Sequence, residues 1–177
     1  MRLSMYMIAE EIPWVETKLH FSEKAKDDCL LQAKFYSPEI PISGRYLYLV
    51  EAKDFPADLP RDDRYHFVVL GADEDFRCPE QSEMILLNTA DTPFIVYDIL
   101  QKCFEWYNIW EEKLVEILNS DADIQKMCQV SKKIFVNPVI AHDGSYEVIG
   151  TSVNREVMEA LDFPYHENIG SYVASPN

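Results

Sequence analysis

Glycine is scarce in this chain, and the glycine-rich loops that cradle phosphate groups are missing from it. Only 5 of the 177 residues are glycine. Neither G-x-G-x-x-G nor a Walker sequence occurs, which excludes the nucleotide-binding loops of both types. No serine stands in the G-x-S-x-G context of a hydrolase nucleophile. We therefore expect a protein that is not an enzyme and that carries no cofactor.

Paired cysteines and long apolar runs are also lacking. The four cysteines are Cys29, Cys78, Cys103 and Cys128, and they form no C-x-x-C pair. No histidine lies at zinc spacing from them, so no metal site is expected. Reduced thiols and the lack of a secretory signal are typical of a cytoplasmic protein. No apolar run approaches the roughly 18 residues of a membrane span, so we expect no membrane partner.

Positive charge is in short supply. The chain has 16 Lys and Arg residues against 31 Asp and Glu residues, a formal net charge of −15. Binding to a phosphate backbone needs clustered cations that release counterions, so we expect no direct nucleic-acid contact by this chain. Hydrophobic residues make up 47% of the sequence, which is enough to form a buried core.

The first half of the chain alternates short apolar runs with turns. A short helix is predicted at residues 3–12, capped by Ser4 and ended by Pro13. Extended segments are predicted at 14–21, 30–36, 46–50, 66–70 and 84–87. The last three are almost continuously apolar, as in strands covered on both faces. Their polar connections leave no room for a crossover helix, although residues 55–59 could form one turn. The pattern predicts a small α/β sheet with flanking helices, with α+β as the alternative.

A long helix follows, with Asp91 or Thr92 as its cap and Pro93 in its first turn. It is predicted to run to about Asn119, a length of roughly 40 Å. Seven residues along it recur at alternating intervals of four and three, which is the a/d period of a helix that pairs with a partner. This seam consists of Val96, Leu100, Cys103, Tyr107, Trp110, Leu114 and Ile117.

The seam allows two interpretations. A helix packed on a sheet also repeats apolar residues at these spacings. This helix carries further apolar residues off the seam, such as Trp106 and Val115, and one face cannot hold all of them. We expect the first half to dock on the α/β unit. The second half then needs a second copy of the chain or the following domain, and we favour a homodimer.

The remaining residues predict the opening of another module. A second helix is predicted at residues 124–133, capped at Ser120-Asp121, and a β-hairpin with an Asp-Gly turn at 139–150. A short helix is expected at 155–161. We accordingly divide the chain into an N-terminal α/β domain (1–91), a linker and dimerisation segment (92–134) and part of a sensor domain (135–177).

Two places invite a chemical interpretation. Gly71-Ala72-Asp73 follows a strand, a position where α/β proteins often bind ligands. His142-Asp143 contains metal-ligating residue types, but a dipeptide supplies too few ligands, and a hairpin turn explains it better. Asp73-Glu74-Asp75 lacks the glycine and distal glutamate of a calcium loop. None of these forms a catalytic constellation.

Residues 94–151 resemble a recurring stretch in bacterial transcription regulators of the PucR/CdaR type. The resemblance lies in FEWYNIWEEKL at 104–114, IQKM at 124–127 and FVNPVIAHD at 135–143, and it extends to 3–11 and 46–50. It implies an N-terminal α/β region, a linking helix and the start of a PAS- or GAF-like sensor domain. Such regulators carry a C-terminal helix-turn-helix domain, which has no counterpart here, so the resemblance implies an N-terminal fragment.

The leading hypothesis from the sequence is a non-enzymatic sensory and dimerisation region of a transcription regulator. A small-molecule effector or a partner would shift the packing of the α/β unit against the long helix. One rival is a stand-alone adaptor that uses the exposed aromatic part of the helix. A second rival is a small enzyme or ligand-binding protein with its site at the strand ends near 71–75 or around His142.

Overall fold

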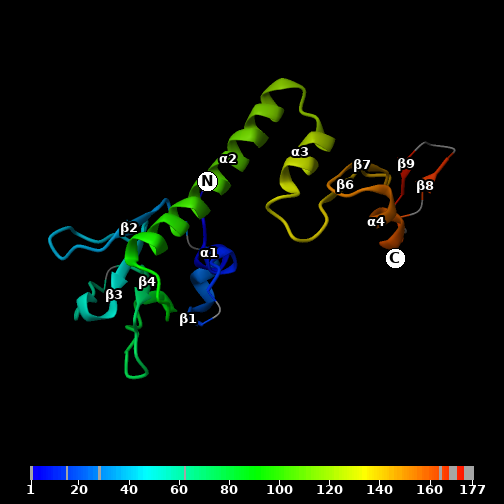
Figure 1. Cartoon of the computed structure of the whole chain (residues 1–177). Helices are drawn as coiled ribbons and strands as arrows, with labels where there is room; N and C mark the ends of the chain where they lie inside the picture. The colour runs from blue at the N-terminus through cyan, green and yellow to red at the C-terminus, as the bar shows by residue number, and fades with distance from the viewer. Residues whose placement is uncertain are drawn as a thin grey trace. The chain divides into compact units, whose positions relative to one another are not determined.

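A computed structural model describes residues 2–14, 16–27, 29–61, 63–163, 165–167 and 171–173. The chain forms two compact units, Met1–Trp106 and Tyr107–Asn177. The boundary between them falls inside the longest helix, α2 (Pro93–Ser120), so this helix contributes to both units (Figure 1). The predicted three-part division at residues 91 and 134 stays a prediction.

The first unit contains a mixed five-stranded sheet. Its strands are β1 (Thr17–His20), β2 (Ala33–Phe35), β3 (Leu47–Glu51), β4 (Tyr65–Leu70) and β5 (Ser82–Leu87). Their order is β1-β5-β4-β3-β2, in which β2 to β5 are parallel and β1 runs antiparallel to β5. The predicted α/β class is therefore confirmed. The central strand β4 is buried along its whole length, as a strand covered on both faces must be.

Irregular connections cover one face of this sheet. Tyr48, Tyr65, Phe67 and Met84 belong to the buried cluster on that face. Each parallel crossover adds apolar side chains to the cluster: Tyr36 and Ile42, then Phe55 and Leu59, then Phe76 and Cys78. As predicted, the described residues that connect the parallel strands form no crossover α-helix. The expected turn at 55–59 is wrong in position, because the single helical turn is η2 (Ala52–Asp54) and Phe55 is used instead to pack on Phe67.

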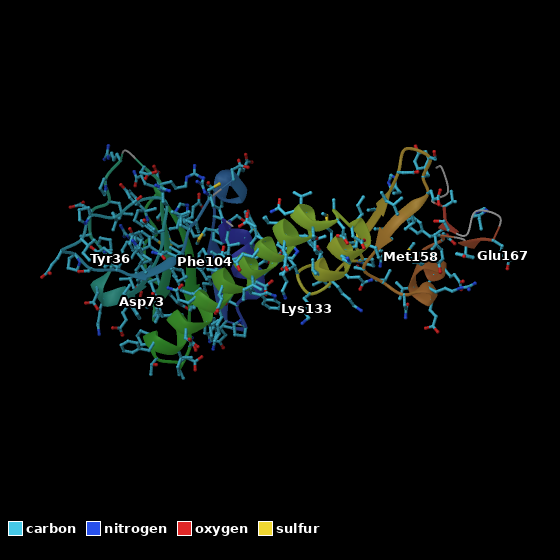
Figure 2. The ribbon with its side chains drawn as sticks, turned by 90° about the horizontal axis from the view of Figure 1, so that it is seen from above. Tyr36, Asp73, Phe104, Lys133, Met158 and Glu167 are labelled. Atoms are coloured by element: carbon cyan, nitrogen blue, oxygen red, sulfur yellow. The ribbon has the colours of Figure 1, made fainter. Side chains whose placement is uncertain are left out.

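Helices cover the opposite face. The helix α1 (Met5–Glu11) buries Met5 and Ile8, and the Ser4 hydroxyl caps it by accepting from the Met7 N–H. The first part of α2 stacks Tyr97 on Phe35 of β2, with ring centroids 4.5 Å apart. The side-chain amide of Gln101 donates to the Ala33 carbonyl at 3.0 Å. Figure 2 labels Phe104, which is buried on this part of α2.

Of the two predicted caps of α2, Asp91 and Thr92, the structure selects Thr92. The helix begins at Pro93, and the Thr92 carbonyl accepts the first helical bond from Val96, so Thr92 holds the cap position. Asp91 has another role, because its carboxylate accepts from the Trp14 indole at 2.7 Å. That bond ties the segment before β1 to the connection between β5 and α2.

The second unit comprises the rest of α2 followed by small elements. These are α3 (Ile124–Ser131), β6 (Ile140–His142), β7 (Val148–Thr151), α4 (Arg155–Ala160), β8 (Tyr165–His166) and β9 (Ser171–Tyr172). The strands β6 and β7 form the predicted hairpin, and β8 pairs with β9. α3 packs closely on β7, since a Cβ atom at Gly150 would lie 3.0 Å from two atoms of Ile124.

In the second unit one local prediction is wrong and another is confirmed. The cap of α3 is Asp123, whose carboxylate accepts from the Lys126 N–H, whereas the predicted Ser120-Asp121 lies at the end of α2. The predicted hairpin turn is confirmed, since Asp143 and Gly144 lie between β6 and β7. Tyr146 adopts a φ of 65°, and the Asp143 carboxylate accepts from the Ser145 and Glu147 N–H groups. This side-chain bonding stabilises the turn without a left-handed glycine.

Candidate functional site

The predicted seam of α2 divides between the two units. Val96, Leu100 and Cys103 are buried in the first unit, where this part of the helix covers the sheet and α1. Burial raises the pKa of the Cys103 thiol to about 11, and the nearby Glu11 carboxylate adds to the shift. These three residues therefore act as core side chains within the chain.

The rest of the seam lies in the second unit. Tyr107 is buried, while Trp110, Leu114 and Ile117 are half-buried. The Trp110 indole N–H donates to the Ser131 hydroxyl of α3 at 3.1 Å, and its ring meets Phe135 edge-on at 5.6 Å. The following segment of the chain thus covers Trp110. A contact of the seam with a second copy stays a prediction.

An apolar surface remains open beside the end of the seam. Val115 and Leu118 are 49% and 61% exposed, and Leu114 is half-buried, with Leu118 between Leu114 and Val115 around the helix. Residues three and four apart are neighbours on a helix, so these three side chains are contiguous. We call Leu114, Val115 and Leu118 the distal apolar surface of α2.

A cavity lies at the carboxyl ends of β4 and β5, where the sequence pointed to Gly71-Ala72-Asp73. Its volume is about 680 Å³, and residues 16–18, 71–74 and 86–88 line it. Figure 2 labels Asp73 in the loop after β4. Leu86 and Leu87 contribute an apolar part, and Glu16, Asp73 and Glu74 an acidic one. The Asp73 carboxylate accepts from the Asp75 N–H, so it also shapes its own turn.

The other chemical candidate is a structural turn. His142 stacks on Tyr146 with ring centroids 5.7 Å apart, and its Nδ1 lies 3.1 Å from the Asp143 carbonyl. The Asp143 carboxylate is occupied by the backbone of the turn. Across the described residues no three His, Cys, Asp or Glu side chains gather in a way that would hold a metal ion.

Sequence reasoning missed a buried ionic group on the helix-covered face of the sheet. Glu83 of β5 is only 1% exposed. Its carboxylate accepts from the backbone and the hydroxyl of Ser22 and lies 3.1 Å from the Arg64 guanidinium. Glu83 neighbours His66 of β4 in the sheet, and His66 is 3% exposed. The available signal was a glutamate beside an apolar strand, which must find a partner when it is buried.

Among the described residues, no helix has both the length and the apolar character needed to cross a membrane. Comparison of the chain with protein-family models, with curated proteins and with solved structures gives no match. Any proposal for its function therefore rests on its own sequence and geometry.

Proposed function

We propose that this chain is the non-enzymatic sensory and dimerisation region of a bacterial transcription regulator whose DNA-binding domain lies outside it. The observation that carries the proposal is α2, a single helix of 28 residues that belongs to both compact units. A helix of that length spans about 40 Å. Because its first turns are buried in the first unit while Tyr107 and Trp110 pack in the second, it suits the transmission of a packing change.

The two ends of α2 are anchored differently, which supports this role. The first half is fixed by buried apolar contacts and by the bond from Gln101 to the backbone of β2. The second half contacts α3 through Trp110 and leaves the distal apolar surface open. A ligand that binds one packing of the first unit better would shift the population of that packing, and a dimeric helix would pass the shift on.

The order of elements in the second unit supports the sensor part of the proposal. α3, the β6–β7 hairpin and α4 occur in the order expected for the start of a PAS- or GAF-like domain. The regulator assignment itself rests on the sequence resemblance and on the placement of α2. A cytoplasmic location follows from the same proposal.

A stand-alone adaptor is the second candidate, and the exposed apolar side chains favour it. Trp106 and Ile109 are 43% and 41% exposed on a different side of α2 from Leu118. An adaptor would use such residues to bind an unrelated partner, whereas the regulator uses the distal apolar surface to bind a second copy.

Sedimentation velocity over a range of concentrations tests the homodimer. We expect the parent chain to dimerise and Leu114→Asp to weaken the dimer, because a carboxylate at the interface would have to be desolvated. Leu118→Asp provides a second variant, since a side chain that is 61% exposed contributes little to the fold of one chain. Ile109→Asp makes the same kind of change at a position that is 41% exposed on a different side of α2, and it should leave the dimer intact.

The variants separate the two outcomes. If Leu114→Asp and Leu118→Asp both sediment like the parent at every concentration, the seam packs only within one chain and the dimerisation role fails. If both become monomeric while Ile109→Asp stays dimeric and all three keep the parent's circular dichroism, the distal apolar surface is the interface.

A further inference from the structure

A second cavity lies at the amino-terminal ends of β3 and β4, at the opposite end of the strands from Asp73. Its volume is about 530 Å³, and its lining includes Arg2, Arg45, Arg64 and His66. The chain has six arginines in all, so half of them line this one cavity. In a protein with a net charge of −15, three arginines at one cavity suggest that their positive charge has a role there.

Ser22 and the buried Glu83 fix the position of the Arg64 side chain. Its guanidinium donates to the Ser22 hydroxyl at 3.1 Å and lies 3.1 Å from the buried Glu83 carboxylate. The Glu83 side chain is 2% exposed and the Arg64 side chain 31% exposed, so the pair is anchored in the core and reaches the cavity at its arginine end. An arginine fixed in this way loses little conformational entropy when it binds a ligand.

Arg2 and Arg45 present unused donors to the same cavity. Neither guanidinium has a hydrogen bond or ion pair to any residue that the structure describes, although each carries five N–H donors. The backbone of Arg45 is nevertheless fixed, since its N–H donates to the Ser43 hydroxyl and its carbonyl accepts from Leu31. The lining thus combines one anchored guanidinium with two that are available.

The acidic lining of the cavity is partly occupied. The two carboxylate oxygens of Asp63 accept from the backbone N–H groups of Gly44 and Arg64. Gly44 permits this close approach, because a Cβ atom there would lie 2.4 Å from the Arg64 carbonyl and 2.6 Å from the Asp63 carboxylate. Asp27 also lines the cavity. The negative charge of Asp27 favours a small anion over a polyanion, because it would repel the further charges of a polyanion.

We propose that this cavity binds a small anion that carries a carboxylate or a phosphate group, with Arg2, Arg45 and Arg64 as its ligands. The planar guanidinium matches both groups through paired N–H···O bonds, which are stronger than bonds between neutral groups. His66, which is 3% exposed, also lines the cavity. As the effector of a sensor this anion would rest on the proposed function, but its binding is measurable without that function.

Isothermal titration calorimetry of the full chain with inorganic phosphate and, separately, with succinate tests the proposal. We expect a saturable one-site isotherm with at least one of the two anions, and the more tightly bound anion identifies the preferred group. The double variant Arg2→Gln/Arg45→Gln should lose about tenfold or more in affinity, because charge-assisted hydrogen bonds disappear. Arg77→Gln removes the same kind of charge at an exposed position away from the cavity and should bind like the parent.

Two results would overturn the proposal. One is the lack of saturable binding of either anion at concentrations up to about 10 mM. Three guanidinium ligands should give a dissociation constant lower than that. The other is an equal loss of affinity in Arg77→Gln, which would assign binding to net charge alone. The same titration on Leu118→Asp keeps the two proposals apart: anion binding that persists in that variant leaves the site intact even if the dimerisation role fails.

Discussion

The Cys103 thiol lies on the covered side of α2, where burial and the Glu11 carboxylate raise its pKa to about 11. In the unfolded chain the thiol has an ordinary pKa, so the folded state holds the proton more tightly. A raised folded-state pKa gives stability that is fully present below the unfolded value and is lost as the pH rises through the folded value. The relevant window therefore lies between about pH 9 and pH 11.

We predict that the stability advantage of the parent over Cys103→Ala shrinks across this window, at a rate approaching about 1.4 kcal/mol per pH unit. Urea unfolding of both proteins at several pH values between about 8 and 11 gives the difference directly. Taking the difference cancels the titration of lysines and tyrosines common to both chains. A gap that stays constant across the window would show that the thiol ionises as easily in the folded state as in the unfolded one.

Contacts between side chains far apart in the sequence were the hardest feature to predict. Glu83, Arg64 and Ser22 meet only after β4 and β5 have been placed side by side, and no spacing in the sequence encodes that meeting. The cap of α3 failed for a different reason, because 120–123 offers several capping residues in a row and backbone geometry selects Asp123. Local rules name the residue types, but the tertiary fold selects among them.

At the scale of elements, the contact between α3 and β7 depends on a residue without a side chain. A Cβ atom at Gly150 would approach Ile124 Cγ2 and the Ile124 carbonyl to 3.0 Å and Cys128 Sγ to 3.1 Å. We predict that Gly150→Ala pushes α3 away and destabilises the second unit by about 1–3 kcal/mol, as overpacking does in other cores.

Gly144→Ala is the matched control for this substitution. It lies in the same hairpin, a Cβ atom there would meet nothing within 4 Å, and Gly144 has no positive φ. Chemical denaturation followed through tryptophan fluorescence measures both variants, because Trp110 packs against α3. Equal stability of the two alanine variants would mean that α3 does not rest on β7 as closely as described.

Elements with strong periodic or capping signals were predicted well. The start of α2 at Pro93 and its end near residue 119 followed from Thr92-Pro93 and from the apolar repeat, and the structure ends the helix at Ser120. The apolar strands were also found. The cover on the second face of the sheet was not, because it comes from aromatic residues in irregular connections, such as Phe55 and Phe76, which have no period to detect.

At the scale of the whole molecule, α2 is the feature that connects the separate arguments. It completes the core of the first unit, contacts α3 in the second, and leaves the distal apolar surface exposed. The arginine-lined cavity lies in the first unit, so an anion bound there would act on the unit that holds the start of α2.

The intact mass of the native polypeptide in its source cells tests the regulator assignment most directly. The account predicts a mass well above the 20.6 kDa of this chain, with further sequence after Asn177 that contains a basic helix-turn-helix. A native mass of 20.6 kDa would contradict it, and the adaptor function would then be the better explanation of the exposed apolar residues on α2.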